Sequence, residues 1–164
     1  TPALGRTASR AGEFAARDAK AIAVSVDSVE DHLRWVPDIA EVAGVDVDFP
    51  IIADEDRSVS QAYDMIHPGE GDTSTVRSVF LIDPSNTVRL TITYPKSVGR
   101  NFTEILRALD ALQATDRSPI STPAEWVPGD RVIVAPAIAT DDARERFANV
   151  DEVKPYLRFA DAPA

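Results

Sequence analysis

The chain has 164 residues, of which 44% are hydrophobic and 27% are charged, and its formal net charge is −10. The negative charge argues against nucleic acids and anionic membranes as partners, because both would repel the protein surface, and no apolar run approaches the ~20 residues that cross a bilayer. The chain contains no cysteine, so these residues by themselves form no disulfide, no thiolate metal site and no thiol nucleophile.

The first part of the chain alternates predicted helices and strands. Apolar residues recur at three- and four-residue steps over residues 4–15, which predicts an opening helix. Residues 21–26 form an apolar run typical of a strand that is covered on both faces. A second short strand is predicted over residues 49–52, and the acidic residues 54–56 open a further helix. This order predicts an α/β fold.

The helix between these two strands has a clear predicted start and a predicted interruption. Ser28 is typical of an N-cap residue, and Asp31, three positions later, takes the place of the usual capping-box glutamate. Pro37 lies inside the helical pattern and should end or kink the helix near Val36, because proline lacks an N–H and its ring meets the preceding turn.

Two strands over residues 76–82 and 88–94, joined by the turn residues 83–87, predict a β-hairpin. Asn101 is predicted to cap the next helix, with Glu104 at the reciprocal position. Beyond residue 113 prolines punctuate a polar stretch, and short segments follow that predict a strand, a helix and a last strand over residues 131–138, 141–147 and 156–159. We therefore predict a main domain over residues 1–113 and a small appendage over residues 114–164.

Several separated segments resemble the one-cysteine peroxiredoxin family over essentially the whole chain. The segments that carry this resemblance are Ser25–Leu33, Phe49–Ile52, Tyr94–Pro95 with Gly99–Phe102, Trp126 with Gly129–Asp130, and Tyr156–Phe159. The last two resemble the C-terminal extension of the family. The resemblance implies a thioredoxin-like mixed sheet flanked by helices, with a small C-terminal α+β extension.

The resemblance also implies an activity: a thiol-dependent peroxidase that reduces hydrogen peroxide and organic hydroperoxides through a peroxidatic cysteine. Thr1 and Pro2 resemble the Thr-Pro that precedes this cysteine in the family, and Leu4–Arg6 resembles a segment that follows it. The cysteine is therefore expected between Pro2 and Ala3, where about four residues of the family pattern are absent. Ala3 stands where the family usually has glutamate, which puts one supporting contact in doubt.

The resemblance assigns catalytic roles to Thr1 and Arg77, and substrate contacts to Thr1, Pro2 and Arg77. The Thr1 hydroxyl would hydrogen-bond the thiolate, and the Arg77 guanidinium would lower the pKa of the thiol and stabilise charge on the peroxide oxygens. An external thiol would reduce the resulting sulfenic acid. No cofactor or metal is implied. Arg100 is open to two interpretations, a member of an ionic network near the site or a solvated charge.

The thioredoxin-like sheet requires a central strand before the active-site helix, between the strands near residues 22–26 and 76–82, and the chain has no segment for it. Without that strand both neighbours would present unpaired backbone groups. We therefore expect residues of a longer molecule before Thr1 and between Pro2 and Ala3, and we expect the present chain alone to be unstable or to aggregate.

Two alternatives remain open from the sequence. The first is a catalytically inactive peroxiredoxin-like module for binding or dimerisation, and the second is a thioredoxin-like domain of another activity. A metal site at Glu30, Asp31 and His32 is disfavoured because their spacing does not put three ligands on one helix face, and residues 67–69 read as a loop. The resemblance further implies an antioxidant homodimer, and no secretory leader pattern is present, so we expect a cytoplasmic location.

Overall fold

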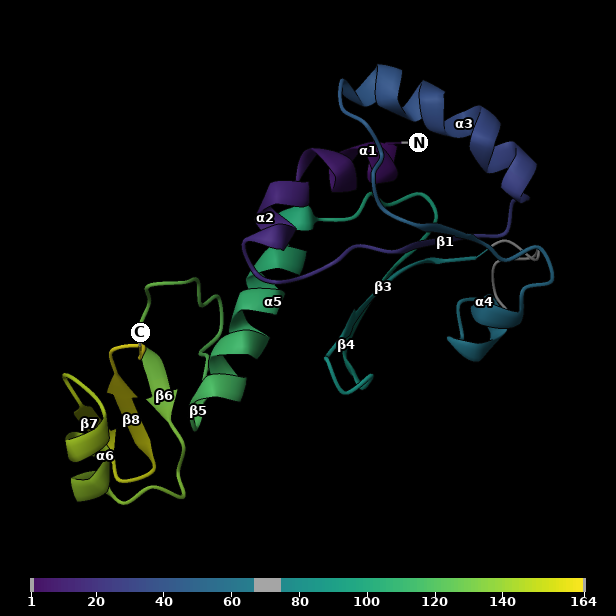
Figure 1. The fold of residues 1–164 in the computed structure, drawn as a ribbon. Helices are drawn as coiled ribbons and strands as arrows, with labels where there is room; N and C mark the ends of the chain where they lie inside the picture. The colour runs from purple at the N-terminus through teal and green to yellow at the C-terminus, as the bar shows by residue number, and fades with distance from the viewer. Residues whose placement is uncertain (1, 67–74, 164) are drawn as a thin grey trace. The chain divides into compact units, whose positions relative to one another are not determined.

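The computed structural model describes residues 2–66 and 75–163, and these divide into two compact units, Thr1–Phe102 and Thr103–Ala164. Figure 1 shows helices and strands in both units, as the α/β prediction requires. The predicted domain boundary after residue 113 falls within α5 (Phe102–Arg117), and that division stays a prediction. In the described part of the chain, no helix combines the length and the apolar composition that a bilayer crossing requires.

The first unit contains four helices and four strands in the described ranges, apart from the first residue of α5. Two short helices open it, followed by alternating strands and helices and then the hairpin. Their bounds are α1 Pro2–Ser9, α2 Ala11–Ala15, β1 Ala23–Ser25, α3 Val29–Ala43, β2 Ile51–Ala53, α4 Ser58–Ala62, β3 Arg77–Ile82 and β4 Val88–Tyr94.

The strands of this unit form two separate pairs. β1 runs parallel to β2, with Ala23 opposite Ile51, and β3 runs antiparallel to β4, with Arg77 opposite Tyr94. Among the described residues, β1 pairs with no strand other than β2, and β3 with none other than β4. The residues of β1 are half-buried, so the predicted coverage of this strand on both faces is incomplete.

The N-cap of α3 agrees with the prediction. The Asp31 backbone N–H donates to the Ser28 hydroxyl at 3.1 Å, and that hydroxyl donates to the Asp31 carboxylate at 2.7 Å. The predicted end of the helix near Val36 is wrong, because α3 continues through Pro37 to Ala43 and ends at Gly44 in the left-handed conformation. The alternative, a kink at Pro37, stays a prediction. Gly44 donates its N–H to Ala40 at 2.8 Å, and the completely buried Ile39 anchors the second half of the helix.

α1 and α3 approach each other at one glycine. A Cβ atom built on Gly5 would lie 2.8 Å from the Ala43 Cβ and 3.7 Å from a methyl carbon of Ile39. Because real Cβ atoms essentially never come as close as the first distance, only glycine lets the two helices pack at this point. Ala8, which is 3% exposed, completes the buried face of α1.

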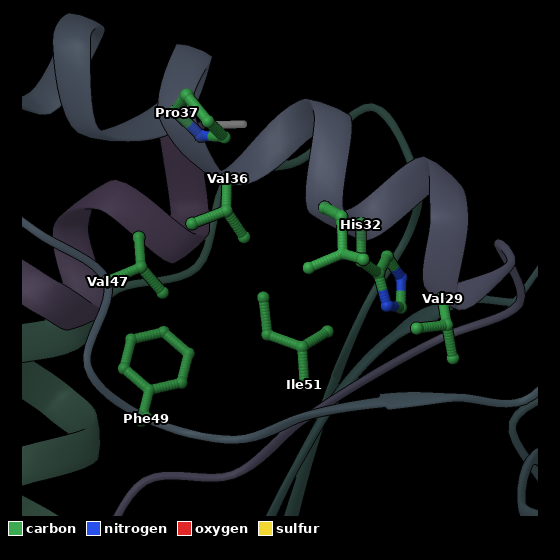
Figure 2. A pocket seen from close by; sticks show the side chains of 8 residues that line it. Val29, His32, Val36, Pro37, Val47, Phe49 and Ile51 are labelled. Atoms are coloured by element: carbon green, nitrogen blue, oxygen red, sulfur yellow. The ribbon is translucent and has the colours of Figure 1, made fainter.

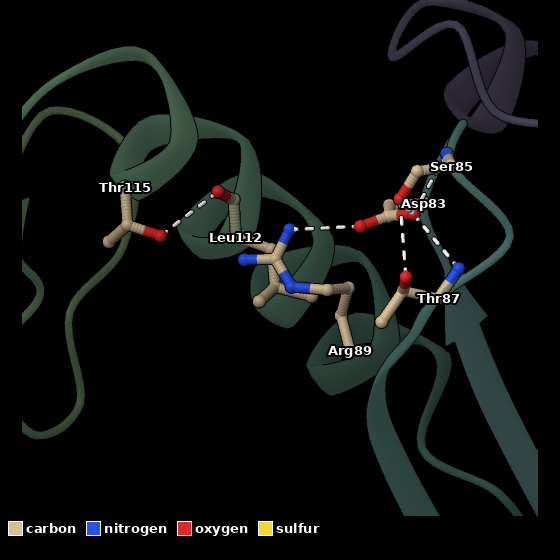
Figure 3. A network of polar contacts seen from close by, with 6 residues as sticks. All are labelled: Asp83, Ser85, Thr87, Arg89, Leu112 and Thr115. Carbon is tan, nitrogen blue, oxygen red and sulfur yellow. Dashed lines mark hydrogen bonds and ion pairs between the residues drawn. The ribbon is translucent and has the colours of Figure 1, made fainter.

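The turn between β3 and β4 is organised by one carboxylate, as Figure 3 shows. Asp83 Oδ1 accepts hydrogen bonds from the backbone N–H groups of Ser85 at 2.9 Å and Thr87 at 3.0 Å. Arg89 donates to the other oxygen at 3.3 Å. The hydrogen bonds from the Ser85 hydroxyl and the Thr87 backbone hold the pKa of Asp83 below its ordinary value, so the turn keeps its charged form over a wide pH range. The hairpin prediction is confirmed.

The second unit has its own hydrophobic core. It comprises most of α5, a four-stranded antiparallel sheet in the order β5-β6-β8-β7, and one short helix. The bounds are β5 Ile120–Ser121, β6 Val132–Val134, α6 Thr140–Arg146, β7 Asp151–Lys154 and β8 Leu157–Ala160. The core consists of Ile120, Trp126, Val132, Val134, Ile138, Ala143, Phe147 and Ala160. The predicted order of strand, helix and strand is therefore observed.

Candidate active site

The hairpin places Arg77 and Tyr94 side by side. Arg77 is the first residue of β3 and Tyr94 the last of β4, and the two are directly opposite in the antiparallel register. Directly opposite residues project from the same face of a sheet, with their Cβ atoms about 5 Å apart. Both side chains are half-buried. The segment that follows β4 therefore begins next to Arg77.

That segment brings a second guanidinium to the same place. Pro95 accepts a hydrogen bond from the Val98 N–H at 2.9 Å, and the Asn101 N–H donates to the Tyr94 hydroxyl oxygen at 3.2 Å, which ties the loop back to the end of β4. In the sequence Arg100 lies between Val98 and Asn101, the donors of these two hydrogen bonds, and it is half-buried. Burial lowers the pKa of Arg100, the positive charge of Arg77 lowers it further, and Tyr94 acts in the opposite direction.

Two neighbouring cations at a half-buried site repel each other, and arginine keeps its charge in proteins. An anion beside the two guanidinium groups offsets their repulsion, and both positive charges stabilise it. A group that becomes negative during a reaction is stabilised in the same way. The pair of guanidinium groups can therefore hold a negatively charged oxygen. Of the two sequence interpretations of Arg100, the structure favours membership of an ionic group that includes Arg77.

The other two predicted site residues are Thr1 and Pro2. Thr1 lies outside the described residues. Pro2 is exposed and opens α1, where it lines a groove between α1 and α3 with Gly5, Ser9 and Ala43. Arg77 is not among the residues that line this groove.

The expected chain break between Pro2 and Ala3 is not observed. Both residues belong to α1, which runs without interruption from Pro2 to Ser9. The Ala3 carbonyl accepts a hydrogen bond from the Thr7 hydroxyl at 2.9 Å, as helix geometry allows across one turn. The expected position of the peroxidatic cysteine, between Pro2 and Ala3, stays a prediction.

Glu30, Asp31 and His32, whose spacing disfavours a metal site, lie at the start of α3. Asp31 binds Ser28 and also pairs with Arg34 at 2.9 Å, whereas the side chain of His32 is buried. The bond from Ser28 and the charge of Arg34 lower the pKa of Asp31 despite some desolvation. In the described ranges, His, Asp and Glu side chains form no cluster of three that could hold a metal ion. The segment at residues 67–69 lies outside the described residues.

Comparisons with known proteins identify the family. The model of the AhpC/TSA family matches residues 1–91, and the model of the C-terminal domain of 1-Cys peroxiredoxin matches residues 111–149. The chain belongs to the peroxiredoxins, in their 1-Cys branch. Peroxiredoxins are thiol-dependent peroxidases with a thioredoxin fold, so the expected fold class and enzyme class are confirmed.

Individual relatives support this assignment along the whole chain. A 1-Cys peroxiredoxin of Dictyostelium discoideum is 48% identical over 99% of this chain, which covers 68% of that protein. The mitochondrial peroxiredoxin PRX1 of Saccharomyces cerevisiae is 47% identical over 90% of this chain, which covers 59% of the yeast protein. A solved structure of a yeast mitochondrial 1-Cys peroxiredoxin matches with a TM-score of 0.91 and 44% identity, over 98% of this chain and 78% of that one.

Sequence reasoning could have placed Arg100 more firmly. In a hairpin, the end of the second strand lies beside the start of the first. Once the hairpin is predicted, a basic residue shortly after β4 is therefore a candidate neighbour of Arg77. The sequence alone could not say whether the loop turns inward, because that depends on the contact between Asn101 and Tyr94.

Proposed function

We propose that the protein is a 1-Cys thiol peroxidase in which a thiolate, supplied by a segment outside these 164 residues, reacts beside Arg77 and Arg100. The observation that carries this proposal is the approach of two guanidinium groups at the end of the β3–β4 hairpin. Such a pair fits a site where an anionic nucleophile meets a peroxide and where charge develops on the leaving oxygen.

The proposed reaction begins with nucleophilic attack on the peroxide. The thiolate sulfur attacks one peroxide oxygen, an S–O bond forms, the O–O bond breaks, and its electron pair leaves with the other oxygen, which takes up a proton as water or an alcohol. The sulfur is thereby oxidised to a sulfenic acid. One external thiol condenses with it to a mixed disulfide and releases water, and a second thiol frees the enzyme. The solved yeast mitochondrial 1-Cys peroxiredoxin has its thiol resolved via the glutathione and thioredoxin systems, which supports an external thiol reductant here.

The catalytic roles of Thr1 and Arg77 remain part of this proposal. Arg77 would stabilise the thiolate and the leaving oxygen, and Arg100 would keep the site attractive to anions. Thr1 would hydrogen-bond the thiolate, and Pro2 would contact the substrate at the start of the active-site helix. Hydrogen peroxide and organic hydroperoxides are the proposed substrates.

The open strand edges support the participation of a further segment. In the described ranges, β1 and β3 are each paired along one side only, and the first unit exposes several large apolar side chains, including Ile22 at 65%, Leu33 at 72% and Val42 at 74%. Unpaired strand edges and exposed apolar groups are costly in water. An additional strand that pairs with β1 or β3 would satisfy the open strand edges.

Intact mass, thiol titration and a peroxidase assay on the protein purified from its natural source test the proposal together. We expect a mass above the 17.7 kDa of these residues, one titratable thiol, and thiol-dependent consumption of hydrogen peroxide and cumene hydroperoxide. A folded 17.7 kDa protein without a thiol and without this activity would instead favour the inactive binding or dimerisation module. The observation that favours this alternative is the absence of cysteine from the chain.

We propose in addition that the protein is a cytoplasmic homodimer that acts as an antioxidant. Exposed apolar side chains of the second unit support an interface, among them Tyr156 at 69% and Val153 at 51%. Sedimentation velocity at micromolar concentration should give twice the monomer mass, and a monomer would contradict the dimer. Cell fractionation tests the location, with the mitochondrial fraction as the contrasting outcome because the yeast relative is named as mitochondrial.

A further inference from the structure

The side chain of Tyr94 is connected to both arginines of the candidate active site. Tyr94 lies directly opposite Arg77 in the β3–β4 register, so the two side chains leave the same face of the hairpin. At the far end of its ring, the Tyr94 hydroxyl oxygen accepts a hydrogen bond from the Asn101 backbone N–H at 3.2 Å. Asn101 directly follows Arg100 in the sequence. Tyr94 therefore reaches from the strand beside Arg77 to the residue next to Arg100.

The loop that carries Arg100 has little packing around its middle. Val98 is 44% exposed, and a Cβ atom built on Gly99 would meet nothing within 4 Å apart from its chain neighbours. A hydrogen bond of 2.9 Å from the Val98 N–H to the Pro95 carbonyl orders the first half of the loop. The Tyr94 hydroxyl restrains the second half, at the residue that directly precedes α5.

We propose that Tyr94 is a positioning residue of the peroxidase reaction, whose hydroxyl oxygen holds Arg100 beside Arg77 through the backbone of Asn101. This inference rests on the proposed function, because it takes the reacting thiolate to lie where the two guanidinium groups meet. The electrostatics of the site support the arrangement. Burial and the charge of Arg77 lower the pKa of Arg100, whereas Tyr94 raises it, so both groups lie close enough to act on the Arg100 guanidinium.

The restraint is needed because Arg100 has a reason to leave its place. A half-buried cation beside a second cation lowers its free energy by turning toward water, where it is solvated and the repulsion is screened. The hydrogen bond to Tyr94 opposes this movement of the adjoining backbone. The net contribution of one hydrogen bond corresponds to a factor of roughly two to ten in such an equilibrium. Loss of the Tyr94 hydroxyl should therefore lower the fraction of molecules with Arg100 in place by up to that factor.

Tyr94→Phe in the full-length, thiol-containing protein removes the hydroxyl and keeps the ring. We expect kcat/KM for hydrogen peroxide, measured by stopped-flow thiol oxidation, to fall by about three- to tenfold. The pKa of the reacting thiol, measured from the ultraviolet absorbance of its thiolate, should rise, because a displaced cation stabilises the thiolate less. A general loss of stability would not move this pKa. Exchange of the Asn101 amide hydrogen, followed by NMR, should become faster, and this measurement does not depend on peroxidase activity.

A double-mutant cycle with Arg100→Met shows whether Tyr94 acts through Arg100. Arg100→Met alone should slow the reaction at least as much as Tyr94→Phe does. The double variant should then be no more than about twofold slower than Arg100→Met, because the hydroxyl has no further guanidinium to hold.

Two control variants separate positioning from other effects of substitution. Tyr63→Phe makes the same chemical change where Tyr63 meets the ring of Phe80 edge-on, with the centroids 5.0 Å apart. Val47→Ala weakens packing in the open apolar groove beneath α3, which Figure 2 shows and which is lined by neither Tyr94 nor Arg100. Both variants should react within about twofold of the wild-type rate, even though Val47→Ala should lower Tm.

The inference is overturned if Tyr94→Phe keeps the wild-type rate and thiol pKa, if Asn101 exchange is unchanged, or if Tyr63→Phe is equally slow. It is also overturned if Tyr94→Phe slows Arg100→Met as much as it slows the wild type. Failure of the proposed function gives a different result, since Arg77→Met would then change neither the rate nor the thiol pKa, and the role of Tyr94 would fall with it. A slow Arg77→Met beside a fully active Tyr94→Phe would reject the role of Tyr94 alone.

Discussion

Arg77 and Arg100 show how two residues that are distant in sequence acquire a joint property. Burial together with the positive charge of Arg77 lowers the pKa of Arg100. This end of the hairpin is the strongest candidate for stabilising negative charge, because an anion there would reduce the electrostatic repulsion between the two guanidinium groups.

Replacement of Arg77 tests its proposed role directly. In the full-length, thiol-containing protein, Arg77→Met should lower kcat/KM for hydrogen peroxide by roughly 10²-fold, the usual effect of removing one group that stabilises a developing oxyanion. Stopped-flow measurement of thiol oxidation gives this rate. Arg89→Met is the matched control, because Arg89 lies on the same hairpin but pairs with Asp83 at the opposite end, and its rate should stay within about twofold of wild type. An equal loss in both variants would mean that the hairpin has been disrupted and would contradict a specific role.

Asp54 makes a pH-dependent contribution to stability at the start of α4. Burial raises the pKa of Asp54, but hydrogen bonds from the Ser60 hydroxyl and from the backbone N–H groups of Val59 and Ser60 outweigh it, so the pKa lies below 3.8. The N–H distances are 2.9 Å and 2.7 Å. The charged carboxylate therefore stabilises the fold above about pH 3.8, and this contribution is lost as the pH falls through the lowered pKa.

We expect Asp54→Asn to lower Tm at pH 7 by roughly 5 °C, and we expect the difference from wild type to shrink below pH 3.8. Thermal unfolding followed by circular dichroism between about pH 2.5 and pH 7 measures both effects. The exposed neighbour Glu55 provides the control, because Glu55→Gln should follow the wild-type profile. A Tm difference that is the same at every pH would show that the carboxylate charge is not the cause.

At the scale of elements, local signals predicted the cap of α3 and the turn of the hairpin but not the bounds of every helix. The Ser28 cap and the Asp83 turn form as the sequence indicates, since each depends on atoms within a few residues. α3 ends later than the sequence indicates. The packing of Ile39 and the C-terminal cap at the left-handed Gly44 stabilise the helix by more than the loss of one hydrogen bond at Pro37 destabilises it. The helix that residues 54–56 are predicted to open begins later, since α4 spans Ser58–Ala62.

The contact between α1 and α3 yields a prediction with an internal control. Gly5→Ala should destabilise the protein by about 1–3 kcal/mol, because the new methyl group would overlap the Ala43 side chain. Gly12→Ala in α2 should instead stabilise it by about 0.5–1 kcal/mol, because nothing lies within 4 Å of the added carbon and alanine is the better helix former. Urea unfolding gives both values, and a destabilisation of similar size in the two variants would contradict the close approach at Gly5.

At the scale of the whole molecule, the two units differ in how well their apolar residues are buried. The second unit has a contiguous core around Val132 and Val134, both completely buried. Its buried Arg158 donates to the carbonyl oxygens of Ile138 and Ala135, the latter at 3.1 Å. The first unit instead has separate strand pairs and exposed apolar groups, which is the physical basis for expecting a further segment there.

The core of the second unit can be tested through its tryptophan, which is 4% exposed. Val134→Ala should lower the free energy of unfolding by about 2–3 kcal/mol through loss of packing and creation of a cavity. Fluorescence of Trp126 in a Trp35→Phe background reports on this unit. Val153→Ala, at a 51% exposed position, should change stability by no more than about 0.5 kcal/mol. A small effect at Val134 would mean that this core is not the main source of stability.

The amino-acid sequence by itself determined the order of helices and strands apart from the split between α1 and α2 and the short strands β5 and β7. It also determined the cap at Ser28, the hairpin and the family, because these depend on short-range patterns and on segments that can be compared directly. Only the tertiary structure decided that Arg100 joins Arg77 and that α3 passes through Pro37. These features arise from contacts between residues far apart in the chain, whose geometry depends on packing and leaves no local periodic signal.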